Sequence, residues 1–228
     1  MGTLAVETIG LSRRYGRRWA LRDVSLSVPQ GSVVMLAGRN GSGKSTLLRV
    51  LATALRPDHG SARVAGHDVQ AGRDGVRQAV ALLGHQSFLY EALSARENLA
   101  VAASLLGRPL DPGVLARVGL AARADDPVSS FSAGMRKRLS LGRVLLQHKP
   151  VALLDEPYGE LDPPGFELLD GVIAELRARG ATVVMATHLV EHGRRLCDRA
   201  LLLDEGQLVW SGPAAEMPLD ALRGSAAP

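Results

Sequence analysis

Eight residues near the start of the chain have the types and spacing of a loop that binds phosphate. They fit the pattern G-x-x-x-x-G-K-[ST], directly after an apolar run, Val33 to Ala37, and before a helix-like segment. The residues are Gly38, Arg39, Asn40, Gly41, Ser42, Gly43, Lys44 and Ser45. Glycines let backbone N–H groups turn toward an anion, and the start of the following helix adds positive potential. We predict a nucleoside triphosphate site in which Lys44 contacts the β- and γ-phosphates, Ser45 binds Mg²⁺ and Thr46 completes the loop.

Two adjacent carboxylates form a second candidate group. The apolar run from Val151 to Leu154 has the length of a buried strand and ends in Asp155 and Glu156. A single acid at the end of a strand is common, but an Asp-Glu pair in a chain with a phosphate loop indicates hydrolysis of the bound nucleotide. Asp155 is predicted to hold Mg²⁺ through water, and Glu156 to polarise the attacking water molecule.

The lysines limit the choice of nucleotide. GTPases read guanine with an Asn/Thr-Lys-x-Asp motif. None of the three lysines, Lys44, Lys137 and Lys149, is followed two residues later by aspartate. A GTPase is therefore excluded.

The composition is that of an ordinary globular protein. Of 228 residues, 46% are hydrophobic and 22% charged, which excludes global disorder. The net charge of +4 is too small to indicate a nucleic-acid partner, and we expect none. The single cysteine, Cys197, excludes an internal disulfide. Because the longest apolar runs are far shorter than the roughly 20 residues that span a bilayer, we expect no membrane helix, and we see no export signal.

The hydrophobic pattern predicts the elements that position these groups. Alternation over Leu4, Val6 and Ile9 and then from Val24 to Val28 predicts an antiparallel strand pair, and strands that alternate with helices predict a mainly parallel sheet. The fold class is α/β: a P-loop NTPase core with a mainly parallel sheet, an N-terminal antiparallel β piece and an inserted α-helical subdomain. Further strands are expected at 33–37, 80–83, 151–154, 182–186, 200–203 and 207–210. Helices are expected at 46–52, within 91–119, at 133–147 and at 165–179.

A predicted helix start upstream of the paired acids carries a family resemblance. Taken alone, the segment after Phe131 is a capped helix whose basic residues, Arg136, Lys137 and Arg138, form a solvated face. Together with the phosphate loop and the paired acids, it resembles the signature of the ATP-binding-cassette (ABC) ATPase family, over roughly residues 4–212. The residues at the signature position are Ser132, Ala133, Gly134 and Met135. The family usually has Ser-Gly-Gly-Gln there, so this chain lacks the glutamine side chain.

The resemblance implies further site residues. Tyr15 matches the aromatic residue that stacks on adenine, with Trp19 as a nearby alternative. Gln86 matches the Q-loop glutamine, which touches Mg²⁺, and His188 matches the switch histidine, which hydrogen-bonds the γ-phosphate. The D-loop position reads Gly-Glu-Leu-Asp and ends in Asp162, where the family usually has Ser-Ala-Leu-Asp.

A zinc site is an alternative for the histidines. The segment from His188 to His192, with Glu191 between them, matches the zinc-peptidase pattern H-x-x-E-H. A zinc site needs both histidines on one face of a continuous helix and a third ligand. His188 is instead expected where a strand ends, and matches of this length arise easily by chance.

The resemblance also implies partners and an arrangement of the chain. In this family two ATPase chains pack head to tail with ATP between them, so we expect a homodimer and integral membrane permease subunits. Ser87 to Tyr90 forms an apolar patch that would contact the permease or pack in the core, and the chain would work on the cytoplasmic face of the membrane. In one ABC ATPase domain, 1–85 and 150–212 would form the α/β core, 86–149 the helical subdomain and 213–228 a loosely docked tail.

The sequence gives the least direct indication of the transported substrate. Leu83 to Gln86 and the compact C-terminus resemble the ATPase of the haem exporter used in cytochrome c maturation. Exporters of drugs, polysaccharides or lipids share most of these features and stay open. A soluble, non-transport ABC ATPase of DNA repair or the ribosome is the alternative from another class. It would normally carry a long coiled-coil insertion or two fused cassettes, and 228 residues with one phosphate loop disfavour both.

Overall fold

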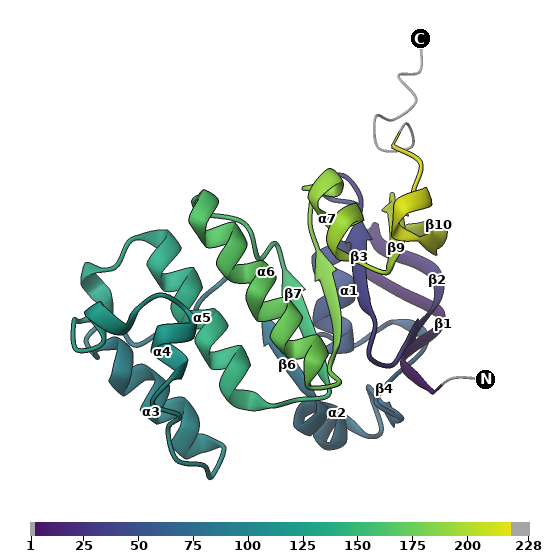
Figure 1. Cartoon of the computed structure of the whole chain (residues 1–228). Coiled ribbons are helices and arrows are strands. Elements are labelled where there is room, and N and C mark those ends of the chain that lie inside the picture. Colours follow the sequence, from purple (N-terminus) through teal and green to yellow (C-terminus); the bar gives the residue numbers. More distant parts are fainter. Residues whose placement is uncertain (1–2, 220–228) are drawn as a thin grey trace.

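Two β-sheets and the helices that pack on them form the molecule (Figure 1). The computed structural model describes residues 3–219. The strands are β1 Leu4–Tyr15, β2 Arg18–Pro29, β3 Val33–Ala37, β4 His59–Val64, β5 His67–Asp68, β6 Val80–Leu83, β7 Val151–Asp155, β8 Thr182–Ala186, β9 Arg199–Asp204 and β10 Gln207–Pro213. The helices are α1 Lys44–Leu51, α2 Arg73–Ala79, α3 Ala95–Leu105, α4 Val114–Arg117, α5 Ala133–Gln147, α6 Pro163–Ala178 and α7 Val190–Leu196.

The larger sheet has the strand order β10-β9-β3-β8-β7-β6. Neighbours from β9 to β6 run parallel, and only the terminal β10–β9 pair is antiparallel. Every residue of β3, β7 and β8 is buried, as expected for parallel strands covered on both faces. The predicted α/β fold is confirmed. Because β3, β7 and β8 are parallel neighbours, the loops that follow them all leave from one edge of the sheet.

Each face of this sheet contributes to a different hydrophobic core. Met35 of β3 belongs to a core shared with Leu139 of α5 and Leu169 of α6. The next residue, Leu36, points to the other face and packs in a second core with Leu47 of α1. The second core also takes the buried face of the smaller sheet, β2-β1-β4-β5, whose pairs are antiparallel. The antiparallel N-terminal piece is therefore present as predicted.

The alternation predicted for the first strand fails at Ile9. Val6 and Thr8 are buried, but Ile9 is 62% exposed and Leu11 is buried again. The pairing of β1 with β2 shifts register between Thr8 and Leu11, where Gly10 has φ +58°. Such a bulge inserts an extra residue and turns the next side chain to the opposite face. Grouping Ile9 with Val6 was wrong, because Ile9 directly follows the buried Thr8 and so lies on the opposite face of the strand. The bulge after it returns Leu11 to the buried face.

The helices lie close to their predicted positions, with three differences. Within 91–119, helix spans only α3 and α4, and α3 begins with a capping box made by Ser94 and Glu97. The helix predicted at 165–179 begins earlier, at Pro163, because proline fits the first helical turn. Helix α2 was not predicted, since it buries only Val76 and Ala79. In Figure 1 α3, α4 and α5 lie on one side of the molecule, far from β1 and β2.

The predicted tail at 213–228 divides into two parts. Ala214 and Met217 are buried in the core beside α7 and β9, so the first part is firmly packed and not loosely docked. The remaining residues of the predicted tail, 220–228, lie outside the described part of the chain.

Candidate functional site

The phosphate loop connects β3 to α1, as its position in the sequence predicts. Gly43 stands directly before α1 with φ +106°, a conformation that strains residues with a side chain. A Cβ atom at Gly43 would lie 2.4 Å from the carbonyl oxygen of Ala20 on β2. Glycine at this position therefore lets the loop pack directly on the smaller sheet, and the free N–H groups of the first turn of α1 open toward the loop.

Lys44 lies in the centre of this loop. Its Nζ donates hydrogen bonds to the carbonyl oxygens of Gly38 at 2.8 Å and Arg39 at 3.2 Å. It also lies 3.9 Å from Oε1 of Glu156, an ion-pair distance. Burial lowers the pKa of Lys44, against the opposing effects of Glu156 and Asp155. A partly desolvated ammonium at the centre of the loop is suited to bind a polyphosphate anion.

Ser45 and Asp155 bring two oxygen ligands together across the site. The Ser45 hydroxyl donates to Oδ1 of Asp155 at 2.9 Å, although 110 residues separate them. Asp155 is only 6% exposed, at the end of β7. Mg²⁺ prefers a few hard oxygen ligands and keeps several of its waters. The hydroxyl and the carboxylate therefore fit a magnesium ion held beside the phosphates.

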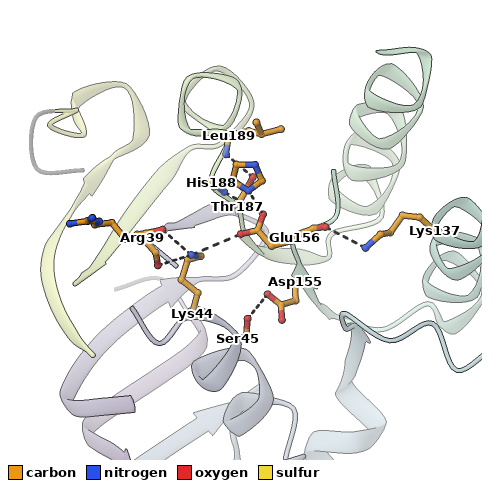
Figure 2. A network of polar contacts seen from close by, with 10 residues as sticks. Arg39, Lys44, Ser45, Lys137, Asp155, Glu156, Thr187, His188 and Leu189 are labelled. Carbon is orange, nitrogen blue, oxygen red and sulfur yellow. Dashed lines mark hydrogen bonds and ion pairs between the residues drawn. The ribbon is translucent and has the colours of Figure 1, made fainter. Parts of the chain in front are cut away.

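Glu156 joins the loops that follow β3, β7 and β8 (Figure 2). Its Oε2 lies 2.8 Å from Nδ1 of His188 and 3.4 Å from the backbone nitrogen of the same residue. The backbone N–H of Glu156 donates to the carbonyl oxygen of Ala186 at the end of β8, at 2.9 Å. One carboxylate thus lies between a cation from the phosphate loop and an imidazole from the far side of the site.

An open cleft of about 340 Å³ runs from the phosphate loop to the β1–β2 turn. Tyr15 lines it together with Asn40, Lys44, Ser45 and Glu156, and the tyrosine ring is about half exposed. This places an aromatic ring and the phosphate-binding residues on the walls of the same cleft. The geometry favours Tyr15 as the residue that stacks on a base.

Trp19, the alternative, faces elsewhere. It lines an adjoining opening and packs beside His59 and Arg14. Trp19 therefore does not line the cleft that contains Lys44 and Ser45.

Comparison with known proteins identifies the family. The sequence model of the family described as ABC transporter matches residues 21–159, which include the phosphate loop, the signature position and both acids. The chain belongs to this family. A solved structure described as the ATP-binding subunit of an ABC transporter superposes with a TM-score of 0.85 and 29% identity, over 97% of this chain and 98% of that one. A subunit of the cbiONQ complex of Clostridium perfringens gives a TM-score of 0.81 and 25% identity, over 93% of this chain and 90% of that one.

Two groups of sequence relatives are prominent. A daunorubicin resistance ATP-binding protein of Streptomyces coeruleorubidus is 38% identical over 95% of this chain and 71% of its own length. A cytochrome c biogenesis ATP-binding export protein of Bordetella bronchiseptica is 40% identical over 83% of this chain and 87% of its own length.

The ABC family membership establishes the general activity. The chain is an ATP-binding, ATP-hydrolysing subunit that powers a membrane transporter. Members of the family dimerise and act with membrane permease components. Within residues 3–219, every helix is too short or too polar to cross a bilayer.

The signature residues form a separate surface of this ABC subunit. The Ser132 hydroxyl accepts a hydrogen bond from the Met135 N–H and caps α5, while the Met135 side chain packs partly into the core. A Cβ atom at Gly134 would lie 2.8 Å from the carbonyl oxygen of Glu160, so glycine permits close contact with the D-loop segment. Asp162 caps α6 and pairs with Arg138. The cleft lined by these residues shares no residue with the cleft at the phosphate loop.

Gln86 lines neither the cleft at the phosphate loop nor the cleft at the signature. It follows β6 in an exposed bend, and within the described chain it makes no hydrogen bond to Ser45 or Asp155. Its predicted contact with Mg²⁺ therefore stays a prediction.

The zinc alternative finds no support. His188 pairs with Glu156, whereas His192 faces Asp170 at 2.9 Å and the Tyr158 hydroxyl at 3.1 Å, so the two histidines have different partners. No group of three metal-binding side chains occurs in the part of the chain that the structure describes.

Sequence reasoning missed Lys137. The run from Arg136 to Arg138 was expected to form a solvated face, yet Lys137 is only 8% exposed and its Nζ lies 3.4 Å from the carbonyl oxygen of Glu156. The run of three basic residues does not show which one is buried, because burial depends on which face α5 turns toward the β7–α6 loop.

Proposed function

We propose that two copies of this chain form a homodimer in which each ATP is bound by the phosphate loop of one copy and the signature helix of the other. Two observations support this arrangement. The signature cleft and the phosphate-loop cleft are separate within one chain. In addition, Ser132 begins a helix whose N-terminal dipole attracts an anion, and the start of this helix lines a cleft of its own away from the phosphate loop. One chain therefore carries two half-sites and is a poor ATPase as a monomer.

The chemistry proposed for each complete site follows from the pairs described above. Lys44 and the start of α1 neutralise the triphosphate, and Tyr15 stacks on adenine. Mg²⁺, held by Ser45 and by Asp155 through water, would neutralise charge on the phosphates, with Gln86 reaching it after a movement of its loop. Glu156 accepts a proton from the attacking water molecule, and His188 holds the carboxylate in position and hydrogen-bonds the γ-phosphate. The observation that carries this proposal is the Glu156 carboxylate lying between Lys44 and His188.

The test uses the purified full chain with ATP. We expect affinity for adenine nucleotides that depends on Mg²⁺, and a specific activity that rises with protein concentration until dimers saturate. Specific activity independent of concentration, from a chain that stays monomeric with ATP bound, would contradict the shared site. Removal of Mg²⁺ with EDTA is expected to abolish hydrolysis.

An apolar patch beside the helical part of the chain supports a membrane-protein partner. Phe88 is 76% and Tyr90 57% exposed, in a chain with few aromatic residues. Arg143 of α5 donates to the carbonyl oxygens of Ser87 at 2.6 Å and Phe88 at 3.1 Å, which fixes the patch to α5. We propose that a cytoplasmic segment of a permease contacts this patch, and that the chain works on the cytoplasmic face of the membrane, where ATP is available.

For the transported molecule we propose haem, delivered for cytochrome c maturation. The 40% identity to the cytochrome c biogenesis protein, over most of both chains, supports this substrate. The daunorubicin resistance protein, matched over 95% of this chain, favours drug export as the second candidate. Deletion of the gene is expected to abolish covalent haem staining of c-type cytochromes. Normal staining together with increased sensitivity to daunorubicin would favour drug export instead.

A further inference from the structure

Lys137 is a buried cation that the proposed chemistry does not use. It lies in the first half of α5, between Arg136, which donates to the carbonyl oxygen of Phe131, and Arg138, which pairs with Asp162. Lys137 alone of the three turns into the protein, where it lines a small cleft of about 140 Å³ with Glu160 and the residues after β6. Taking an ammonium out of water is costly, and a buried ion seldom adds to stability. The buried ammonium of Lys137 therefore needs a hydrogen-bond partner inside the protein.

The partner is the main chain of Glu156. The Lys137 Nζ donates to the carbonyl oxygen of Glu156 at 3.4 Å, and this is its one hydrogen bond within residues 3–219 (Figure 2). Burial lowers the pKa of Lys137, and the more distant carboxylates of Glu160, Asp155 and Glu156 only partly oppose this shift. None of them lies within ion-pair distance of Lys137 in the described chain. The backbone carbonyl group of Glu156 is thus the hydrogen-bond partner of this ammonium.

The backbone of Glu156 needs such support. Its φ of +45° lies in the left-handed region, which is unfavourable for a residue with a side chain. Such a conformation persists only where neighbours hold it. The N–H of Glu156 bonds to Ala186 at 2.9 Å, and its carbonyl oxygen accepts from Gly159 at 3.1 Å and from Lys137. The orientation of the Glu156 backbone sets the direction in which its side chain leaves the main chain, and therefore the position of the carboxylate.

We propose that Lys137 is a positioning residue for ATP hydrolysis: its ammonium holds the carbonyl group of Glu156 and thereby keeps the carboxylate aligned with His188 and the attacking water. This inference rests on the proposed role of Glu156. It gives α5, which begins with the signature, a direct contact with the backbone of Glu156 in its own chain. A displacement of about 1 Å in a reacting group is enough to lower a rate by about a hundredfold.

The test compares Lys137→Met with Lys149→Met in the full chain. Both changes remove one lysine, but Lys149 lies after α5, away from the site. For Lys137→Met we expect kcat at least tenfold lower, with the affinity for a fluorescent ATP analogue within twofold and the melting temperature unchanged or raised, because a buried charge is replaced by an apolar chain. Lys149→Met should keep the kcat of the wild type. A kcat within twofold of wild type for Lys137→Met overturns the inference, and so does a parallel loss of kcat, affinity and melting temperature, which indicates a structural role.

A double mutant separates this inference from the proposed function. In single-turnover experiments Lys137→Met should add no further loss to Glu156→Gln, because the carboxylate it positions is already gone. A further tenfold loss overturns the inference, since Lys137 would then act elsewhere. If Glu156→Gln alone keeps wild-type turnover, the proposed role of Glu156 fails as well. If Glu156→Gln is inactive while Lys137→Met is fully active, only the inference about Lys137 fails.

Discussion

The Nδ1 atom of His188 lies 2.8 Å from Oε2 of Glu156, across 32 residues of sequence and two neighbouring strands. Figure 2 shows the imidazole above the carboxylate and Lys44 on its other side. The contact orients the carboxylate with one oxygen toward His188 and the other toward the phosphate loop. A general base needs such an orientation, because it must lie within hydrogen-bond reach of the water that it activates.

Replacing Glu156 by glutamine should separate ATP binding from hydrolysis. The amide keeps the size of the side chain but cannot accept a proton from water. We expect kcat to fall about a hundredfold to ten-thousandfold, with nucleotide affinity equal to or higher than that of the wild type. Phosphate release and equilibrium nucleotide binding measure the two effects. Glu167→Gln, at an exposed position on α6, is the control and should hydrolyse ATP normally. Near-normal turnover of Glu156→Gln would remove Glu156 from its proposed role.

Tyr15 and Trp19 should differ in their effect on nucleotide affinity. Tyr15 lines the cleft with the phosphate loop, while Trp19 packs beside His59 and Arg14. Loss of one stacking contact is worth about 1 kcal/mol, so Tyr15→Ala should weaken ATP binding about fivefold. Binding of inorganic triphosphate should not change, because it has no base. Trp19→Ala should leave ATP affinity within twofold. If Trp19→Ala has the larger effect in calorimetric titrations, the assignment of Tyr15 is wrong.

The hydroxyl of Tyr158 should contribute to stability. Tyr158 is buried, its hydroxyl donates to Asp170, and His192 lies 3.1 Å away. The burial and then Asp170 raise the pKa of Tyr158, so it stays a neutral donor throughout the working range. Tyr158→Phe should lower the free energy of unfolding by about 1 kcal/mol, measured by urea denaturation.

Tyr90→Phe is the matched control for that measurement. The ring of Tyr90 is 57% exposed, and its hydroxyl makes no hydrogen bond within residues 3–219. The Tyr90→Phe variant should therefore unfold at the same urea concentration as the wild type. Equal stability of both variants would show that the hydroxyl of Tyr158 contributes nothing.

Cys197 should be unreactive in the folded protein. Burial, and then Asp198 and Asp170, raise its pKa to about 12. Because it is the single cysteine of the chain, a thiol reagent reports on it alone. At pH 8 we expect one equivalent of label with the chain unfolded in guanidinium and almost none with the folded chain. Rapid labelling of the folded chain would contradict the buried position of the thiol.

The raised pKa of the Cys197 thiol predicts that stability falls as the pH rises. Its folded pKa lies above the ordinary value of 9.0, so the unfolded chain loses the proton first as pH rises. The stabilising contribution of the thiol is full below about pH 9 and is lost as the pH approaches 12. The free energy of unfolding of the wild type should therefore fall relative to Cys197→Ala between pH 9 and 11. A constant difference between the two would contradict the raised pKa.

Several features of the site could be predicted from short stretches of sequence. The phosphate loop, the acids after β7 and the cap of α5 depend on residues next to one another in the chain, and glycine, lysine and paired carboxylates at fixed spacing have few other uses. The buried strands were recognisable for a similar reason, because a parallel strand covered on both faces is continuously apolar. Ile9 was misplaced, since Val6 and Thr8 are the residues that share the buried face, and the bulge at Gly10 that returns Leu11 to it leaves no clear pattern in the sequence.

The sequence by itself therefore determined the family, the fold class and the local motifs predicted to bind phosphate. Only the tertiary structure decided that Glu156 meets His188 and Lys44, that Tyr15 and not Trp19 lines the cleft with Lys44, and that Lys137 is buried. These facts depend on which strands are neighbours and on how α5 is rotated about its axis. Both are set by the packing of the whole core, to which every element contributes, and not by any one segment of the chain.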